Sequence, residues 1–400
     1  MKQENQVIIA SAARTPMGGL TGVFGDVSAI ELGAAAIHAA TSRAGIATDK
    51  VDSVVMGCVL PAGLGHVPAR QAALKAGLPE SVSCTTVNKA CGSAMRAMMI
   101  GHDEILAGSA HVVVAGGFES MSNAPFLLPD GRKGRRLGHG ATLDHMLYDA
   151  LEDAFERSPG KKVDLMGHIA EEWAGKYGFS REEQDAYALR SLQSARQANE
   201  DGSFAWETAQ VTRTTRGKTV LIDRDEQPFT TDANKIPTLK PAFRPDGTIT
   251  AANSSSISDG AAATVLMHAA AADRLGVTGL ASLAGKATWS GAPRSFPVAP
   301  AMVINKLLEQ LGWNVGQVDL FEVNEAFAVV PMIAMRDCGI PLEKMNVHGG
   351  ACALGHPVGA SGARIVATLI GALKKTGGRR GIAAICLAGG EATALAVEML

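Results

Sequence analysis

Apolar residues along this chain gather in short runs that end at glycine, and longer amphipathic stretches lie between these runs. "VVVAGG" at 112–117 and "ICLAGG" at 385–390 are two such runs, and "MKQENQVIIA" leads into a third. Short apolar runs bounded by turn residues are typical of buried strands, whereas the stretches at 92–107 and 362–375 have the length of helices. The alternation predicts βαβ units with mainly parallel sheets, and therefore an α/β fold.

The same local patterns occur near both ends of the chain. "GIATDKVDSVVMG" at 45–57 resembles "GWNVGQVDLFEVN" at 312–324, since each has a glycine, five further residues and Val-Asp before an apolar run. Further along, 112–119 and 385–391 both contain Ala-Gly-Gly and then a glutamate. Two matches in the same order indicate an internal duplication. We therefore expect two related α/β halves, arranged about a pseudo-twofold axis.

The segment between these halves is more charged and richer in loops. Ser180 and Glu183 have the spacing of a capping box, which predicts a helix running from there towards Asn199. The later stretch "GTITAANSSSISDGAAATVLM" returns to strand and turn residues. The predicted parts are an N-terminal half, an inserted loop domain and a C-terminal half, at 1–121 (completed by about 251–275), 122–250 and 276–400.

The composition narrows the kinds of partner that the protein has. The chain is 46% hydrophobic but only 4% aromatic, and it contains 45 glycines, which suits closely packed elements and backbone that approaches a ligand. Its net charge of −2 supplies no attraction to nucleic acid or to a membrane surface. No apolar stretch has the length of a bilayer-spanning helix. We therefore expect small-molecule substrates, and neither nucleic acid nor a membrane as a partner.

The cysteines show neither CxxC motifs nor paired spacing; they stand at 58, 84, 91, 338, 352 and 386. In a chain of this length, which also begins without a signal-like apolar core, this pattern favours reduced thiols and a cytoplasmic location. No spaced cluster of His, Cys and Asp indicates a metal site, and no GxGxxG follows a strand.

One of these cysteines stands among small residues. Cys91, in "VNKACGSAM", directly precedes a predicted helix, and Gly92 and Ser93 leave its sulfur and the nearby backbone N–H groups approachable. The positive end of a helix favours a thiolate, so Cys91 is a candidate nucleophile. The alternative is a buried structural cysteine.

Three further residues have chemistry that a thiol nucleophile needs. His356 lies in the glycine-rich stretch 349–364, and the proline after it restricts it to extended conformations, as suits a fixed general base. Cys386 ends an apolar strand. Asn324, in "EVNEAFA", marks a strand-to-helix junction, where it is either an N-cap or a functional amide.

A basic loop lies within the inserted segment. "GRKGRRLGHG" at 131–140 contains four cationic residues, namely Arg132, Lys133, Arg135 and Arg136. Such a loop either meets phosphate groups or is simply a solvated turn.

The order of Cys91, Asn324, His356 and Cys386 along a duplicated α/β chain resembles the thiolase family, most of all its short-chain acetyl-CoA acetyltransferases. The resemblance extends over the whole chain and rests on "RTPMGGLTG", "VNKACGSAMRA", "GGFESMSNAP", "GTITAANSSSISDGAAA", "VNEAFA", "GHPVGASGARI" and "CLAGGEATALAVEML". It implies the thiolase fold, in which two duplicated halves pack as alternating α and β layers beneath an inserted loop domain.

The resemblance also implies roles for the candidate residues. Cys91 would carry the acyl group as a thioester, and His356 would accept its proton. Cys386 would be the second acid/base, and Asn324 would orient a water that joins His356 in one oxyanion hole. The backbone N–H groups of Cys91 and Ala388 would form the other hole.

The same resemblance implies the substrates and the assembly. Coenzyme A thioesters would be substrates, no cofactor would be tightly bound, and the protein would be a homotetramer, a dimer of dimers. The substrate-binding residues implied are Ser255, Met166, Ala326, Phe327, Arg132 and Arg135.

Three departures from the family pattern concern coenzyme A and the oxyanion hole. Ala388 replaces a usual glycine, three serines occupy 254–256, and Phe229 stands where many relatives have an arginine at the adenine end. The alternatives are a 3-ketoacyl-CoA thiolase of longer chain preference and a non-catalytic acyl-CoA- or lipid-binding protein. A decarboxylating β-ketoacyl synthase is disfavoured because such enzymes lack a second catalytic cysteine like Cys386.

Overall fold

The computed structural model describes residues 6–134, 137–158, 162–215 and 217–400. Most of its strands form a single mixed sheet of ten strands, in which the order is β12-β13-β14-β11-β1-β10-β5-β3-β4, with β2 (Gly18–Gly19) beside β10. The strands of the N-terminal part are β1 (Val7–Arg14), β3 (Ser53–Gly57), β4 (Ser83–Val87), β5 (Val112–Ser120) and β10 (Ser258–His268). Those of the C-terminal part are β11 (Ala281–Ser290), β12 (Leu320–Val323), β13 (Arg380–Leu387) and β14 (Glu391–Met399).

Both halves of this sheet have the same strand order. β3, β5, β10 and β1 are neighbours in one half, and β12, β13, β14 and β11 follow each other in the same way in the other. Even the edge strand β4 has a counterpart, because Met345 makes a parallel bridge to Phe321 of β12. The expected internal duplication is therefore visible in the topology.

The expectation of mainly parallel sheets is wrong. The pairs β3–β4, β3–β5 and β12–β13 are parallel, but β10 runs antiparallel to both β1 and β5, and β14 runs antiparallel to both β11 and β13. The reason is that the long strand that ends each half enters between two earlier strands and runs against them. Local sequence patterns do not reveal that order.

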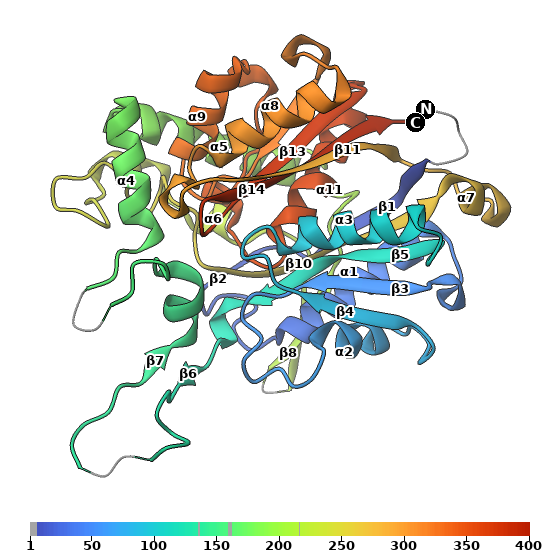
Figure 1. The fold of residues 1–400 in the computed structure, drawn as a ribbon, viewed down its shortest axis with the longest axis horizontal. Coiled ribbons are helices and arrows are strands. Elements are labelled where there is room, and N and C mark those ends of the chain that lie inside the picture. The colour runs from blue at the N-terminus through green and yellow to red at the C-terminus, as the bar shows by residue number, and fades with distance from the viewer. Residues whose placement is uncertain (1–5, 135–136, 159–161, 216) are drawn as a thin grey trace.

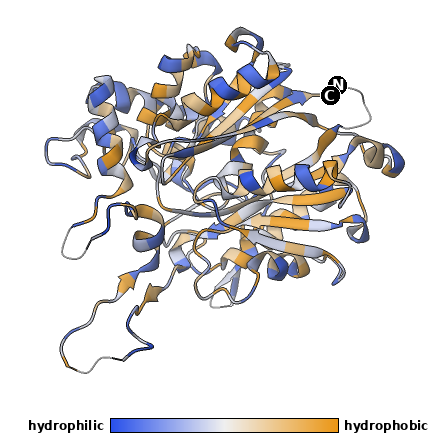
Figure 2. Cartoon of the chain, in the orientation of Figure 1, coloured by the Kyte–Doolittle hydropathy of each residue, from blue (hydrophilic) through white to orange (hydrophobic). Residues whose placement is uncertain are grey.

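Helices separate and cover the two halves of the sheet, as Figure 1 shows. β1 and β11 pair only through Ile8–Ser282 and Ile9–Ala281, so the sheet bends there and its halves enclose α3 (Ser93–Leu106) and α11 (Ser361–Thr376). The outer layers are formed by α1 (Ala29–Ala44) and α2 (Pro68–Lys75) on one side, and α8 (Ala299–Leu311) and α9 (Val329–Cys338) on the other. Figure 2 shows apolar residues concentrated on the strands between these layers.

The remaining elements lie mostly in the inserted segment. They are β6 (Phe126–Leu127), β7 (Leu143–Asp144), α4 (Met166–Tyr177), α5 (Arg181–Glu200), β8 (Val211–Thr215), β9 (Lys218–Ile222) and α6 (Gln227–Thr230), followed by α7 (Ala269–Leu275) and α10 (Ala351–Leu354). The capping box at Ser180 is confirmed, since its hydroxyl accepts from the N–H of Glu183 and the Glu183 carboxylate accepts from the N–H of Ser180. No helix in the described ranges is long and apolar enough to cross a membrane.

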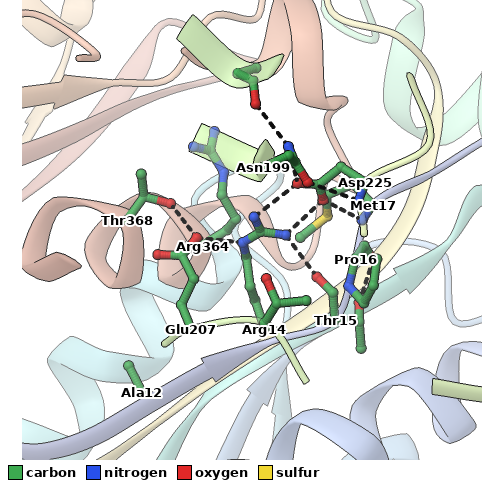
Figure 3. A network of polar contacts seen from close by, with 12 residues as sticks. Ala12, Arg14, Thr15, Pro16, Met17, Asn199, Glu207, Asp225, Arg364 and Thr368 are labelled. Atoms are coloured by element: carbon green, nitrogen blue, oxygen red, sulfur yellow. Dashed lines mark hydrogen bonds and ion pairs between the residues drawn. The ribbon is translucent and has the colours of Figure 1, made fainter. Parts of the chain in front are cut away.

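A buried ionic network ties the inserted segment to the end of β1 (Figure 3). Arg14 is fully buried; its Nε donates to Glu207 Oε1 at 2.5 Å, and its two terminal nitrogens donate to the two oxygens of Asp225 at 2.7 and 3.0 Å. Paired, bidentate geometry of this kind is what a buried guanidinium requires. The inserted segment is thus held firmly against the N-terminal half, although the boundaries near 121, 250 and 275 stay predictions.

Candidate active site

A cavity of about 520 Å³ lies where the inserted segment meets both halves. Its lining includes most of the candidate residues, namely Cys91, Met166, Ser255, Ala326, Phe327, His356, Cys386 and Ala388. Asn324 is not part of the lining, but it lies behind His356. The fold therefore brings together residues that are up to several hundred positions apart in the sequence.

Cys91 stands at a tight turn between β4 and α3. Ala90 has φ of +44°, a left-handed conformation that is costly for a residue with a side chain. The turn is held by Ser93, whose hydroxyl accepts from the N–H of Lys89 at 2.8 Å and donates to the carbonyl of Ala90 at 2.6 Å. Cys91 is half-buried and lines the cavity, so it is not a core cysteine.

The backbone N–H groups at Cys91 favour a thiolate, as expected, but burial outweighs their effect. Burial raises the pKa of the Cys91 thiol to about 11, although the backbone N–H groups of Ala388 and of Cys91 itself oppose this effect. Two N–H groups beside one sulfur cannot replace the water that an anion loses on burial. The same two N–H groups are available to the oxygen of a thioester formed on Cys91.

The hydrogen bonds of His356 indicate its tautomer. Its Nδ1 lies 2.6 Å from Ser361 Oγ, and that hydroxyl donates its only proton to the carbonyl of Pro357 at 3.0 Å. With the hydroxyl proton assigned to the carbonyl of Pro357, Nδ1 is the donor, which leaves a lone pair on Nε2. The backbone N–H of His356 is itself held by Ser258 Oγ at 3.1 Å.

His356 is a neutral base in this environment. Burial lowers the pKa of its imidazole to about 3, and the positive charge of Arg364 contributes in the same direction. The ring is therefore uncharged across the neutral range and has a lone pair on Nε2, but a pKa this far below 7 makes it a weak base on its own.

Asn324 directly follows β12, and its backbone N–H donates to the carbonyl of Ala384 at 3.0 Å. It is not an N-cap, because α9 begins at Val329 and is preceded by Ala328 in the capping position. The side-chain Nδ2 lies 3.5 Å from His356 Nε2. The side-chain amide of Asn324 therefore lies beside Nε2 of His356, a residue that lines the cavity.

Cys386 is the penultimate residue of β13 and is only 2% exposed. Burial and the neighbouring Cys91 both raise the pKa of its thiol. Two thiols and one neutral imidazole thus share a single cavity, which is an arrangement for moving protons and acyl groups.

Hydrogen bonding distinguishes Ser255 from its two serine neighbours. Ser254 Oγ donates to the carbonyl of Thr250 at 2.7 Å, and Ser256 Oγ pairs with Ser258 Oγ at 3.2 Å. The Ser255 hydroxyl makes no such bond within the described part of the chain, although its backbone N–H donates to the carbonyl of Ala326. Of the three serines, Ser255 is the one whose side chain is available to a ligand.

The rest of the cavity wall is apolar. Phe327 packs edge-on against Phe243, with ring centroids 6.0 Å apart, and it also contacts Phe296. Several lining residues are not predicted by any motif in the sequence, namely Leu147, Ala150, Leu151, Phe243, Phe296, Ile257 and Val358. Such side chains look like ordinary core residues in a sequence, so only the fold reveals them.

Of the two predicted arginines, the structure describes only Arg132, and it is not at the cavity. Arg132 is exposed in the long loop between β6 and β7, which extends away from the body of the molecule (Figure 1). It is not among the residues that line the cavity. Arg135 lies outside the described residues.

A second, smaller cavity of about 240 Å³ adjoins the first, since Ala251 and Ser256 line both. Its polar lining includes Lys235 and Asp232. Near it, Phe229 is covered by the guanidinium of Arg224, 4.4 Å from the ring centroid. The described residues contain no cluster of His, Cys, Asp and Glu side chains that could hold a metal ion.

Comparison with protein families gives matches over nearly the whole chain. Residues 7–270 match the N-terminal domain of thiolase, and residues 277–399 match its C-terminal domain. The chain belongs to the thiolase family. This confirms the resemblance that the motifs around Cys91, His356 and Cys386 indicated.

Relatives of this thiolase are similar over their full length. The chain is 47% identical over 397 residues to acetyl-CoA acetyltransferase 2 of Arabidopsis thaliana, covering 98% of this chain and 97% of the relative. It is 44% identical over 391 residues to an acetyl-CoA acetyltransferase of Pseudomonas aeruginosa, covering 97% and 98%. The crystal structure of the Bacillus anthracis acetyl-CoA acetyltransferase superimposes with a TM-score of 0.95 at 38% identity, covering 99% of both chains. The thiolase fold is therefore confirmed.

Proposed function

We propose that this thiolase is an acetyl-CoA C-acetyltransferase that interconverts two acetyl-CoA with acetoacetyl-CoA and free coenzyme A. The observation that carries the proposal is that Cys91, Cys386 and the neutral imidazole of His356 surround one cavity. The names of its full-length relatives in Arabidopsis thaliana and Pseudomonas aeruginosa support the acetyl group as the one transferred.

In the first half-reaction, Cys91 Sγ attacks the carbonyl carbon of acetyl-CoA, and its proton moves to His356 Nε2. A thiol of pKa about 11 does not ionise beforehand, so the proton leaves as the carbon–sulfur bond forms. The N–H groups of Cys91 and Ala388 stabilise the oxyanion. The thioester bond to coenzyme A then breaks, and the leaving thiolate takes a proton from Cys386.

In the second half-reaction, the Cys386 thiolate removes a proton from the α-carbon of a second acetyl-CoA. The resulting carbanion attacks the acetyl group on Cys91, and Cys91 leaves as a thiol after recovering the proton from His356. The carbonyl oxygen of the second acetyl-CoA develops enolate charge, which His356 and a water oriented by Asn324 would stabilise. The products are acetoacetyl-CoA and coenzyme A, and Cys91, His356 and Cys386 return to their starting protonation states.

We assign coenzyme A to the two adjoining cavities. The pantetheine arm would lie along the larger cavity beside Ser255 and the Phe327 wall, and the nucleotide would reach the smaller cavity. Lys235 is then a cation available to the phosphates near the position where Phe229 stands in place of an arginine. Replacing Lys235 by alanine would raise the KM for coenzyme A more than it lowers kcat.

A cytoplasmic location and a homotetramer, as a dimer of dimers, are part of this proposal. All six cysteines are unpaired, and the reaction needs Cys91 and Cys386 as free thiols, which a reducing compartment maintains. β4 lies at the edge of the sheet, where a second copy could pair with it, and the β6–β7 loop carries the exposed Leu128 and Leu137. Native mass spectrometry gives the number of copies directly.

Intact-protein mass spectrometry after mixing with acetyl-CoA tests the reaction class. Wild type should gain one acetyl group, and Cys91→Ala should gain none. Cys386→Ser should still be acetylated but should not form acetoacetyl-CoA. An adduct with longer acyl-CoA alone would favour a 3-ketoacyl-CoA thiolase of longer chain preference. No adduct with any acyl-CoA would replace this proposal with a non-catalytic acyl-CoA- or lipid-binding protein.

A further inference from the structure

Arg364 is a buried cation in a position where a helix does not favour one. It lies in the first turn of α11 and is only 1% exposed. The start of a helix repels positive charge, and a guanidinium removed from water needs strong partners. A residue that breaks both rules within a folded domain calls for a functional explanation.

Its contacts are few compared with those of the other fully buried arginine. Arg14 is satisfied by two carboxylates, whereas Arg364 Nη1 lies 3.6 Å from Glu322 Oε2, beyond hydrogen-bond distance. Neither that Nη1 nor the Glu322 oxygens have a hydrogen-bond partner in the described part of the chain. The other terminal nitrogen, Nη2, donates to Asn324 Oδ1 at 3.3 Å.

We propose that Arg364 is a positioning residue, which fixes the side-chain amide of Asn324 so that its N–H₂ end faces His356 Nε2. An amide has an acceptor end and a donor end on opposite sides. Because Arg364 can only donate, it holds the oxygen of Asn324, and Nδ2 must then point the other way, 3.5 Å from His356 Nε2. If the amide flipped, its oxygen would meet the lone pair of that nitrogen.

Glu322 is the carboxylate beside Arg364, with its Oε2 3.6 Å from Nη1. It lies in β12, two residues before Asn324, and it is the nearest carboxylate to the guanidinium. The residues Glu322, Arg364 and Asn324 thus form a short series that leads to His356, which lines the cavity. Neither Glu322 nor Arg364 lines the cavity, so neither is expected to contact the substrate.

The inference rests on the proposed function, since Asn324 matters only if an oxyanion forms beside it. A misdirected donor weakens the transition state while leaving the bound substrate in place. We therefore expect Arg364→Lys, which keeps the charge but loses the planar pair of donors, to lower kcat by roughly 10- to 100-fold. Its KM should stay within about twofold of wild type.

A double-mutant cycle with Asn324→Ala separates positioning from general damage. If Arg364 acts through Asn324, then Arg364→Lys costs nothing further in the Asn324→Ala background. If kcat of the double variant is instead lowered by the product of the two single losses, the proposal is wrong. A wild-type kcat in Arg364→Lys alone would also overturn it.

Two further variants keep the test independent of folding. Arg14→Lys alters the other buried arginine, and it should lower the melting temperature without changing kcat per acetylated Cys91. Glu322→Gln leaves the size of the side chain unchanged and should reduce kcat several-fold, again only when Asn324 is present. If Arg364→Lys does not fold, the double-mutant cycle of Glu322→Gln with Asn324→Ala tests the proposal by itself. Failure of wild type to gain an acetyl group would instead reject the proposed function.

Discussion

Cys91 lies two residues before the start of α3, and the backbone N–H groups of Cys91 and Ala388 favour an anion there, yet burial raises the pKa of its thiol to about 11. His356 is buried in the same cavity, and the pKa of its imidazole falls to about 3. Both groups are therefore uncharged at neutral pH, because a cavity that excludes water disfavours an isolated ion of either sign. In the proposed reaction, charge appears only when the substrate carbonyl becomes an oxyanion.

The pKa of His356 predicts how it affects stability as pH changes. The unfolded chain binds a proton near pH 6.5, whereas the folded chain resists it until about pH 3, so this residue's contribution to stability is present above pH 6.5 and is lost as pH falls. His356→Asn removes the titrating group. The difference in unfolding free energy between wild type and His356→Asn, measured in urea, should therefore increase from pH 4.5 to 6.5 and stay level above pH 7. A pH-independent difference would contradict the lowered pKa.

The backbone N–H of Ala388 gives a second prediction for a single residue. Ala388→Pro removes this donor, and kcat should fall on the order of a hundredfold or more, because one oxyanion contact is lost. Ala388→Gly keeps the donor and should stay within a few-fold of wild type. Both rates should be measured as acetoacetyl-CoA thiolysis on variants of unchanged circular dichroism. A fully active Ala388→Pro would exclude this N–H from the oxyanion hole.

Among the elements, those defined by local chemistry were the ones predicted correctly. The capping box at Ser180 opens α5 as expected, and the helix-length stretches became α3 and α11. The sequence does not distinguish a cap from a functional amide at Asn324, because it does not show that α9 starts only at Val329. The local sequence also does not show where two helices cross. α11 meets α3 so closely that a Cβ on Gly362 would lie 2.5 Å from the backbone nitrogen of Met95.

A pair of helical glycines tests this close approach. Gly362→Ala should lower the unfolding free energy by roughly 1–3 kcal/mol, because the new methyl meets backbone that cannot easily move. Gly175→Ala in α4 meets nothing within 4 Å, and it should raise that free energy by up to about 1 kcal/mol through helix propensity. Urea unfolding of both variants provides the comparison. Shifts of equal sign and size would show that propensity, and not the α3–α11 contact, decides the result.

At the scale of the whole molecule, the cavity exists only because distant segments meet. Cys91, Cys386 and His356 were identifiable from motifs, but the antiparallel entry of β10 and β14 and the apolar wall were not. Arg364 stood in a recognised motif, yet its role depends on a contact with Asn324, which is 40 positions away. Residue type and spacing thus predicted the chemistry, whereas tertiary contacts set its geometry and the space for the acyl chain.

That space should determine chain length, and Ile257 is the side chain to change. It packs in the same apolar cluster as Cys91 and Val358, beside the place where the acyl group would be bound. Thiolysis of 3-ketohexanoyl-CoA leaves a butyryl group on Cys91, whereas acetoacetyl-CoA leaves only acetyl. Ile257→Ala should therefore raise the ratio of kcat/KM for the longer substrate to that for the shorter by about 10-fold or more. Ile37→Ala, in α1 and far from the cavity lining, also loses a buried side chain but should leave the ratio unchanged. If Ile257→Ala loses activity on both substrates equally, the acyl group extends in another direction.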